Sequence, residues 1–219
     1  MPGALHRDFI RANTVLAAPP LVPEIKLHLA SEVTPLWQAT EATLEKSQLP
    51  PPYWAFAWAG GQALARHLLD HAPLVAGKSV LDFGAGSGLV AIAARKAGAI
   101  TVTAAEIDPF AAAAIALNAA ANRCAVEIAT ADVIGSAPRW DIVLAGDMCY
   151  ERPLAERLTD WLLRCAAAGA LVLLGDPGRA YLPRETLTAL ARYIVPTPLD
   201  LEDRTERETT VWRLAGSRL

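Results

Sequence analysis

The pattern of apolar and polar positions becomes regular from residue 78 onward. Short apolar runs, each with an acidic residue at or near its end, alternate with longer segments of helical composition. Five runs have the length and composition of buried strands: KSVLDFG, ITVTAAE, VEIATAD, WDIVLAGD and GALVLLGD. Strands that alternate with helices predict an α/β protein with a parallel sheet and right-handed crossovers.

Helices are expected around and between these strands. GGQALARHLLDHAP ends before Pro73, LVAIAARKAG closes at Gly98, and PFAAAAIALNAAANR has Pro109 in its first turn. Two more helices are expected, over residues 153–167 and over PRETLTALARY. In the tail, YIVPTPL and ETTVWRL flank the charged stretch LEDRTER, which predicts an antiparallel strand pair with a solvated turn.

The first fifty residues predict an irregular arm outside this regular pattern. LAAPPLVP is stiffened by prolines, and EIKLHLA has the alternation of a half-buried strand. Thr34 and Pro35 are typical of an N-cap and a first helical position, which predicts a helix to about Lys46.

Composition limits the classes of function. The 219 residues, 53% of them hydrophobic and with a net charge of −3, fit one large domain and argue against binding to nucleic acid. No apolar run reaches the roughly 18 residues of a membrane span, and the N-terminus lacks the apolar stretch of a signal peptide. Cys124, Cys149 and Cys165 form no CxxC, so we expect reduced thiols and a cytoplasmic protein. His67 and His71 have no third ligand nearby, so no metal site is expected.

A glycine-rich turn, DFGAGSG at 82–88, follows a predicted strand and precedes a predicted helix. Leu89 stands where the dinucleotide motif GxGxxG needs its third glycine, and the phosphate-loop motif is absent. The carboxylate of Asp82 would repel a pyrophosphate, whereas it would attract a cationic ligand. S-adenosylmethionine fits this chemistry because it has no phosphate and has both an ammonium and a sulfonium. The turn residues expected at that cofactor are Asp82, Gly84, Gly86, Ser87 and Gly88.

Acidic residues at the next strand ends complete the expected cofactor site. Glu106, about 20 residues beyond the turn, is placed to accept both hydrogen bonds of a ribose diol. Ile107 and Asp108 follow it, and Asp108 is also the expected N-cap of the next helix. Asp132 is placed to accept from an adenine amino group, with Val133 against the ring.

Four acids thus end consecutive strands, at the edge where open α/β sheets bind ligands. They are Asp82, Glu106, Asp132 and Asp147. This pattern resembles the class I methyltransferases over about residues 78–214. The resemblance implies a Rossmann-like, mostly parallel seven-stranded sheet with helices on both faces and a C-terminal antiparallel hairpin.

The fourth strand leads into Asp147-Met-Cys-Tyr150, which resembles the (D/E)xx(Y/F) signature of seven-strand protein-lysine methyltransferases. Neither proline of the (N/D)PP(Y/F) sequence of base and glutamine methyltransferases is present. Asp147 is expected to capture and orient a lysine, and Tyr150 to hydrogen-bond the amine or to wall its channel. The alternative is that Asp147 only caps the helix that begins near RPLAERL. Cys149 has no histidine partner in any motif, so packing is expected for it.

The aromatic segment PPYWAFAWAGGQ, residues 51–62, narrows the resemblance further. With VPEIKLHLASEVTPLW, the glycine turn, AGDMCYERPLAERL and GDPGRAYLP, it is similar to the family of lysine methyltransferases that act on the electron-transfer flavoprotein β-subunit, bacterial members included. Because the segment stands directly before the helix that leads to the cofactor strand, we expect it to lie across the open edge of the sheet, with Ala55 and Phe56 packed inward. Trp58 is then expected to border the methionine end of the cofactor, while Trp54 and Tyr53 face the acceptor channel. A small amine or a ribosomal protein is the alternative substrate.

The resemblance implies two parts and a protein partner. Residues 1–50 are expected to form a strand-and-helix arm that covers the active site, and residues 51–219 the methyltransferase domain. The implied partner is the flavoprotein β-subunit, and the enzyme is expected to be a monomer. In GDPGRAYLP, Arg179 and Tyr181 either contact that protein, or Arg179 pairs with Asp176.

Overall fold

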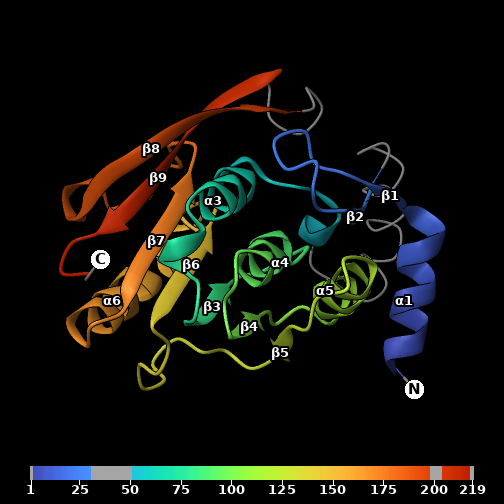
Figure 1. Ribbon diagram of the computed structural model, residues 1–219, viewed down its shortest axis with the longest axis horizontal. Coiled ribbons are helices and arrows are strands. Elements are labelled where there is room, and N and C mark those ends of the chain that lie inside the picture. Colours follow the sequence, from blue (N-terminus) through green and yellow to red (C-terminus); the bar gives the residue numbers. More distant parts are fainter. Residues whose placement is uncertain (1, 31–50, 198–203, 218–219) are drawn as a thin grey trace.

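The computed structural model of the protein describes residues 2–30, 51–197 and 204–217. Its main sheet has seven strands in the order β5-β4-β3-β6-β7-β9-β8 (Figure 1). The strands are β3 (Ser79–Phe83), β4 (Thr101–Ala105), β5 (Glu127–Ala129), β6 (Ile142–Gly146), β7 (Leu171–Asp176), β8 (Leu187–Pro196) and β9 (Glu206–Leu214). The first five are parallel, and the last two form an antiparallel hairpin on β7. The predicted fold class is confirmed.

Helices cover both faces of the sheet (Figure 1). They are α3 (Ala59–Asp70), α4 (Leu89–Lys96), α5 (Pro109–Ala121) and α6 (Arg152–Ala167). Each face of the sheet has its own hydrophobic core. Successive residues of a strand contribute to different cores, because neighbouring side chains of a strand point to opposite faces. Val80 packs with α3 and α4, whereas Leu81 and Val143 pack with Trp161 of α6. In the described part of the chain, no helix is long and apolar enough to cross a membrane.

The helix predicted over PRETLTALARY is wrong. A short 3-10 turn, η3 (Arg184–Thr186), leads into β8, which pairs with β9 along its whole length. The alanine and leucine content favours a helix locally, but the ladder with β9 satisfies the backbone of this edge segment and overrides that propensity. The predicted hairpin itself is confirmed, with β8 beginning earlier than expected.

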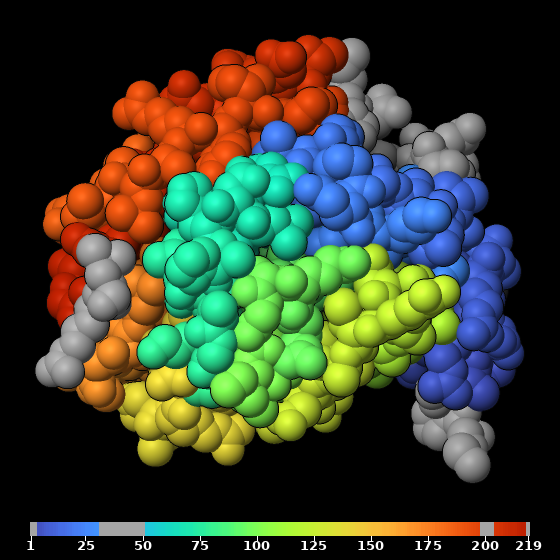
Figure 2. All heavy atoms as spheres, viewed as in Figure 1, coloured from blue at the N-terminus to red at the C-terminus, as the bar shows by residue number. Residues whose placement is uncertain are grey.

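The described part of the arm contains a helix that the sequence analysis did not predict. α1 (Pro2–Asn13) packs on α5, where Phe9 contacts Phe110 and Ile10 is fully buried. β1 (Val15–Ala17) and β2 (Leu27–Leu29) then form a small antiparallel sheet, so the strand expected within EIKLHLA is confirmed. Figure 2 shows the blue arm against the yellow-green surface of α5. The helix expected from Thr34 to Lys46 lies outside the described residues.

Candidate functional site

A pocket opens at the carboxyl ends of the parallel strands. It is lined by Phe56, Trp58, Gly61, Asp82, Gly84, Ala85, Gly86, Ser87, Leu89, Val90, Gly146 and Asp147. The glycine turn, the aromatic segment and the end of β6 therefore meet in one place, although they are far apart in the sequence. This is the edge at which open α/β sheets bind their ligands.

The glycine turn needs the backbone freedom of glycine. Gly84 has a φ of 61°, and a Cβ built there would lie 2.4 Å from Sδ of Met148. No larger residue fits that position without displacing Met148. Gly86 donates its backbone amide to Oε2 of Glu106 at 2.9 Å. The second predicted acid thus holds the turn in place from the end of β4.

Asp82 is almost completely buried beneath the turn. Its Oδ2 accepts a hydrogen bond from the backbone amide of Ala91 in the first turn of α4, at 2.9 Å. Burial raises the pKa of Asp82 to about 7, and Glu106 adds to this, while the Ala91 amide opposes it. A buried acid with so high a pKa favours a cationic ligand, which would stabilise the carboxylate.

Asp82→Asn is expected to stabilise the cofactor-free protein at neutral pH. Because the folded-state pKa lies above the ordinary value, the folded protein holds a proton that the unfolded chain releases, and stability falls as the pH rises from about 4 to about 7. Asparagine has no such dependence, so its advantage should grow across this window to at most about 4 kcal/mol. Thermal unfolding between pH 4 and pH 8 measures the difference.

Asp141→Asn is the matched control for this measurement. The amide and hydroxyl of Ser79 lower the pKa of Asp141, so this variant should be less stable than wild type by an amount that is nearly constant from pH 4 to pH 8, and small because the group is exposed. If the difference in stability between Asp82→Asn and wild type stayed constant with pH, Asp82 would not change its protonation on unfolding.

The other acids of the predicted cofactor site lie at the same edge. Glu106 also accepts from the amide of Asp108 at 3.1 Å, and Asp108 accepts from Phe110, which confirms it as the N-cap of α5. Asp132 is exposed; it accepts from the amide of Ile134 and pairs with Arg157. Its role at adenine stays a prediction, as do the roles of the exposed Ile107 and the buried Val133.

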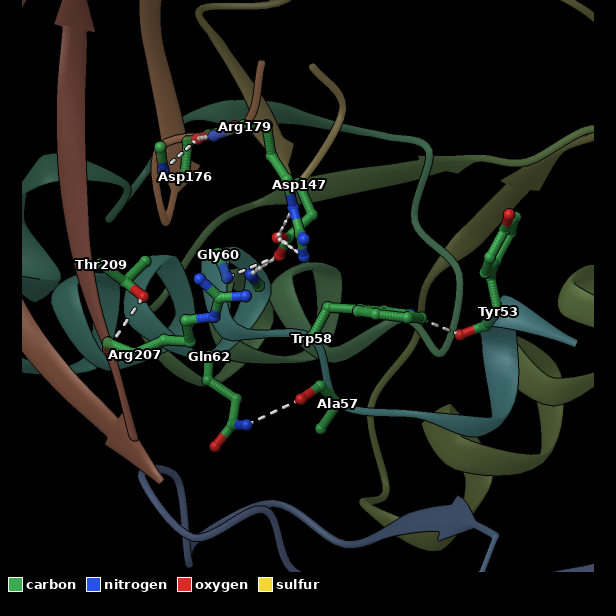
Figure 3. A network of polar contacts seen from close by, with 12 residues as sticks. Tyr53, Ala57, Trp58, Gly60, Gln62, Asp147, Asp176, Arg179, Arg207 and Thr209 are labelled. Carbon is green, nitrogen blue, oxygen red and sulfur yellow. Dashed lines mark hydrogen bonds and ion pairs between the residues drawn. The ribbon is translucent and has the colours of Figure 1, made fainter. Parts of the chain in front are cut away.

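Asp147 connects β6 to the first turn of α3. Its Oδ2 accepts from the amides of Gly60 and Gly61 at 2.5 and 3.1 Å, and its Oδ1 accepts from Nε and Nη2 of Arg179 at 3.2 and 2.9 Å (Figure 3). Burial raises the pKa of Asp147 to about 6, although Arg179 and the Gly61 amide oppose this. The N-cap of α6 is Glu151, so the alternative that Asp147 caps that helix is wrong.

Three glycines allow this contact, and the sequence analysis did not single them out together. Gly146 and Gly175 are paired neighbours on β6 and β7, and the backbone of Gly60 lies directly on them. A Cβ at Gly60 would lie 2.1 Å from the carbonyl oxygen of Gly175. The sequence contains a signal for this packing, since a Gly-Asp pair ends both β6 and β7.

The aromatic segment divides between the pocket and the core. Trp58 lines the pocket, and its Nε1 donates to the backbone oxygen of Tyr53 at 2.9 Å. Trp54 is only 3% exposed and stacks on Phe110, with ring centroids 6.4 Å apart. The prediction that Trp54 faces the acceptor channel is therefore wrong, because the 3-10 turn η1 (Tyr53–Ala55) directs it toward α5.

Three exposed tyrosines follow or precede Trp58, Asp147 and Arg179 by a few residues in the sequence, and we call them the tyrosine rim: Tyr53, Tyr150 and Tyr181. Each is 38–39% exposed, and the rings of Tyr53 and Tyr150 lie 5.8 Å apart. The guanidinium of Arg152 lies over the ring of Tyr181 at 5.4 Å. Burial raises the pKa of Tyr150 to about 12, so its phenol stays protonated and acts only through hydrogen bonds near neutral pH.

Arg179 contacts Asp176 through its backbone amide, whereas the sequence predicted an ion pair of the two side chains as one alternative. The amides of Gly178 and Arg179 donate to Oδ1 of Asp176, both at 2.6 Å, so the contact is through the backbone of Arg179. Its guanidinium instead pairs with Asp147 and lies 5.8 Å from the ring centre of Trp58. The loop after β7 therefore places a cation against two residues that line the pocket, Asp147 and Trp58.

Two buried amides that the sequence analysis missed hold the site together. Nδ2 of Asn118 donates to the backbone oxygen of Ser87, and its Oδ1 accepts from the amide of His28 in β2. In the same way, Nε2 of Gln62 donates to the carbonyl of Ala57, and its Oε1 accepts from the amide of Leu21. Each is a polar residue within an otherwise apolar helix face, a pattern that indicates a specific buried partner.

Comparison with known proteins agrees with this architecture. A family model described as ribosomal protein L11 methyltransferase (PrmA) matches residues 63–170. The chain is 41% identical over 215 residues to an electron transfer flavoprotein beta subunit lysine methyltransferase of Danio rerio, covering 94% of this chain and 82% of that protein. The protein of the same name from Homo sapiens is 39% identical over 217 residues, with 94% and 80% covered.

A solved structure supports the fold. The magnesium protoporphyrin IX methyltransferase of Synechocystis with bound S-adenosylmethionine superposes with a TM-score of 0.53 at 17% identity, covering 71% of this chain and 80% of that one. At this identity the likeness extends to the fold alone, whereas the flavoprotein methyltransferases match nearly the whole chain. The chain therefore belongs to the electron transfer flavoprotein beta subunit lysine methyltransferase family, a family of S-adenosylmethionine-dependent protein-lysine N-methyltransferases.

Proposed function

We propose that this enzyme methylates lysine side chains of the electron-transfer flavoprotein β-subunit. The observation that supports the proposal most strongly is the single pocket that holds the glycine turn, Asp82, Trp58 and Asp147. A cofactor site and an acceptor site must share one cavity, because methyl transfer needs the reacting atoms about 3–3.5 Å apart. We also propose that the enzyme works in the cytoplasm, which its three free cysteines support.

The residues present fit S-adenosylmethionine. The glycine turn offers backbone amides without side chains in the way, and the Asp82 carboxylate suits an ammonium. Glu106 suits a ribose diol, and the Trp58 face suits a sulfonium. When bound, this group supplies an electrophilic methyl group. Among the described residues, no three His, Cys, Asp or Glu side chains gather as a metal site would require.

The acceptor lysine must lose a proton before it can attack. Its ordinary pKa of about 10.4 makes deprotonation at pH 7 cost roughly 4.6 kcal/mol. Burial of the amine at the pocket lowers this cost, because desolvation disfavours the ammonium. We propose that Asp147 first holds the ammonium in place, that the proton leaves to water, and that Tyr150 then hydrogen-bonds the neutral amine.

Trp58→Ala is expected to weaken binding of S-adenosylmethionine by about tenfold. The variant loses both apolar contact and a cation–π attraction of about 0.5–2 kcal/mol. S-adenosylhomocysteine has no sulfonium charge, so its affinity should fall less, and Trp58→Phe should restore most of the difference. Isothermal titration with both ligands measures this. Unchanged affinities would return Trp58 to a purely structural role.

Methyl transfer to purified electron-transfer flavoprotein tests the proposed substrate. Wild-type enzyme and radiolabelled cofactor should label the β-subunit, and lysine-to-arginine variants of that subunit should remove the label. Ribosomal protein L11 belongs in the same assay, because the L11 methyltransferase model matches residues 63–170. Labelling of L11 without labelling of the flavoprotein would overturn the substrate assignment.

A further inference from the structure

Asp147 already holds a cation. Its Oδ1 accepts two hydrogen bonds from the guanidinium of Arg179, while its Oδ2 is held by the amides of Gly60 and Gly61. A carboxylate offers about four acceptor sites, so these four bonds leave little capacity for a further donor. A lysine ammonium that binds Asp147 must therefore compete with Arg179.

The surroundings of Arg179 are those that would also bind a lysine. The guanidinium lies between the buried carboxylate of Asp147 and the indole face of Trp58, at 2.9 Å and 5.8 Å respectively. A carboxylate and an aromatic face together bind any alkylammonium or guanidinium group. Figure 3 shows the Arg179 side chain reaching Asp147 from the loop after β7, on the side opposite the Gly60 amide.

The backbone of this loop is fixed independently of the guanidinium. Oδ1 of Asp176 accepts from the amides of Gly178 and Arg179, and the amide of Tyr181 donates to the carbonyl of Cys149. The side chain of Arg179 is 22% exposed, so solvent reaches part of it. These backbone contacts do not involve the guanidinium, so they can persist when it leaves Asp147.

We propose that Arg179 is a resident competitor that occupies Asp147 until a docked lysine displaces it. This inference rests on the proposed function of Asp147 as the lysine-binding acid. A small amine has only its own few contacts with which to displace an intramolecular cation. A protein substrate contributes further contacts at the tyrosine rim, and such remote binding energy can offset the displacement. Arg179 thus sets a threshold that suppresses methylation of free amines.

Arg179→Gln tests the competition, with Nα-acetyl-lysine amide as the small substrate and the flavoprotein β-subunit as the large one. Assays are run at pH 8.5, well above the wild-type pKa of about 6 of Asp147, because loss of the Arg179 charge raises that pKa further. For the small substrate, kcat/KM should rise about tenfold or more, the worth of a charge-assisted pair. For the protein, KM should fall while kcat stays within about twofold. Arg179→Lys keeps a competing cation with fewer hydrogen bonds to Asp147, so its kcat/KM for the small substrate should lie between those of wild type and Arg179→Gln.

Two results would overturn the proposal. An unchanged kcat/KM for the small substrate would show that Arg179 does not compete, and a fall for both substrates would make it a positioning residue for Asp147. Unchanged affinity for S-adenosylhomocysteine verifies that the variants are folded, and Arg192→Gln, an exposed arginine on β8, controls for loss of a positive charge. If wild-type enzyme fails to label the flavoprotein, only the proposed substrate fails, since the small-substrate result is independent of it.

Discussion

Asp147→Asn is expected to lower kcat/KM for the protein substrate by about 100- to 1000-fold. The variant loses the charge that attracts a lysine ammonium, and hydrogen bonds to a charged group contribute about 1.5–3 kcal/mol each. Its amide group also places a donor against either the Gly60 and Gly61 amides or the guanidinium of Arg179, since every partner of this carboxylate that we observe is a donor. Steady-state kinetics at several protein concentrations measures the effect, most of which should fall on KM if Asp147 captures the lysine.

The fold of this variant should survive, because asparagine has nearly the same size and shape as aspartate and both tolerate a positive φ, which is 58° at this position. Affinity for S-adenosylhomocysteine and the melting temperature report on that. Asp141→Asn makes the same chemical change at the amino end of the sheet, where Asp141 accepts from Ser79, and should retain activity. Wild-type turnover together with an unchanged KM in Asp147→Asn would rule out the capture role.

The fold was predictable because most of its elements have local signals. Apolar strands and capped helices alternate between residues 78 and 176, and helices such as α5 begin at the expected residue, Pro109. Two elements lack such signals. β8 has helical composition and forms a strand because of its hydrogen-bond ladder with β9. α1 has only a narrow apolar stripe, and its stability depends on packing against α5.

The site was predictable as a set of residue types at strand ends, but its internal contacts were not. The sequence indicates that Asp147 and Asp82 share an edge, because parallel strands end together. It does not indicate that Trp54 turns to the core, or that Arg179 reaches Asp147 rather than Asp176. Those outcomes depend on loop and turn geometry of a few residues, for which the spacing of residue types contains no information.

Gly60→Ala is expected to destabilise the protein by about 3 kcal/mol, at the upper end for overpacking. The new Cβ would lie 2.1 Å from the Gly175 carbonyl oxygen and 2.6 Å from Oδ2 of Asp147. A backbone carbonyl in the centre of the sheet cannot move aside as the end of a flexible side chain can. The start of α3 must therefore lift from β6 and β7. The melting temperature should fall by roughly 6–12 °C for a chain of this size.

Gly61→Ala is the matched control, because it adds the same methyl group one residue along the same helix. Its Cβ would meet only Cγ2 of Val90, at 3.9 Å, which is an ordinary contact. Alanine also favours a helix over glycine by about 1 kcal/mol, so this variant should be as stable as wild type or slightly more so. If the two variants had the same melting temperature, close packing of Gly60 on Gly175 would not be the contact that sets the position of α3. Some other contact would then have to hold the α3 amides of Gly60 and Gly61 against Asp147. If only Gly60→Ala falls, the same close approach that forbids a side chain there is what brings the helix amides to the acid.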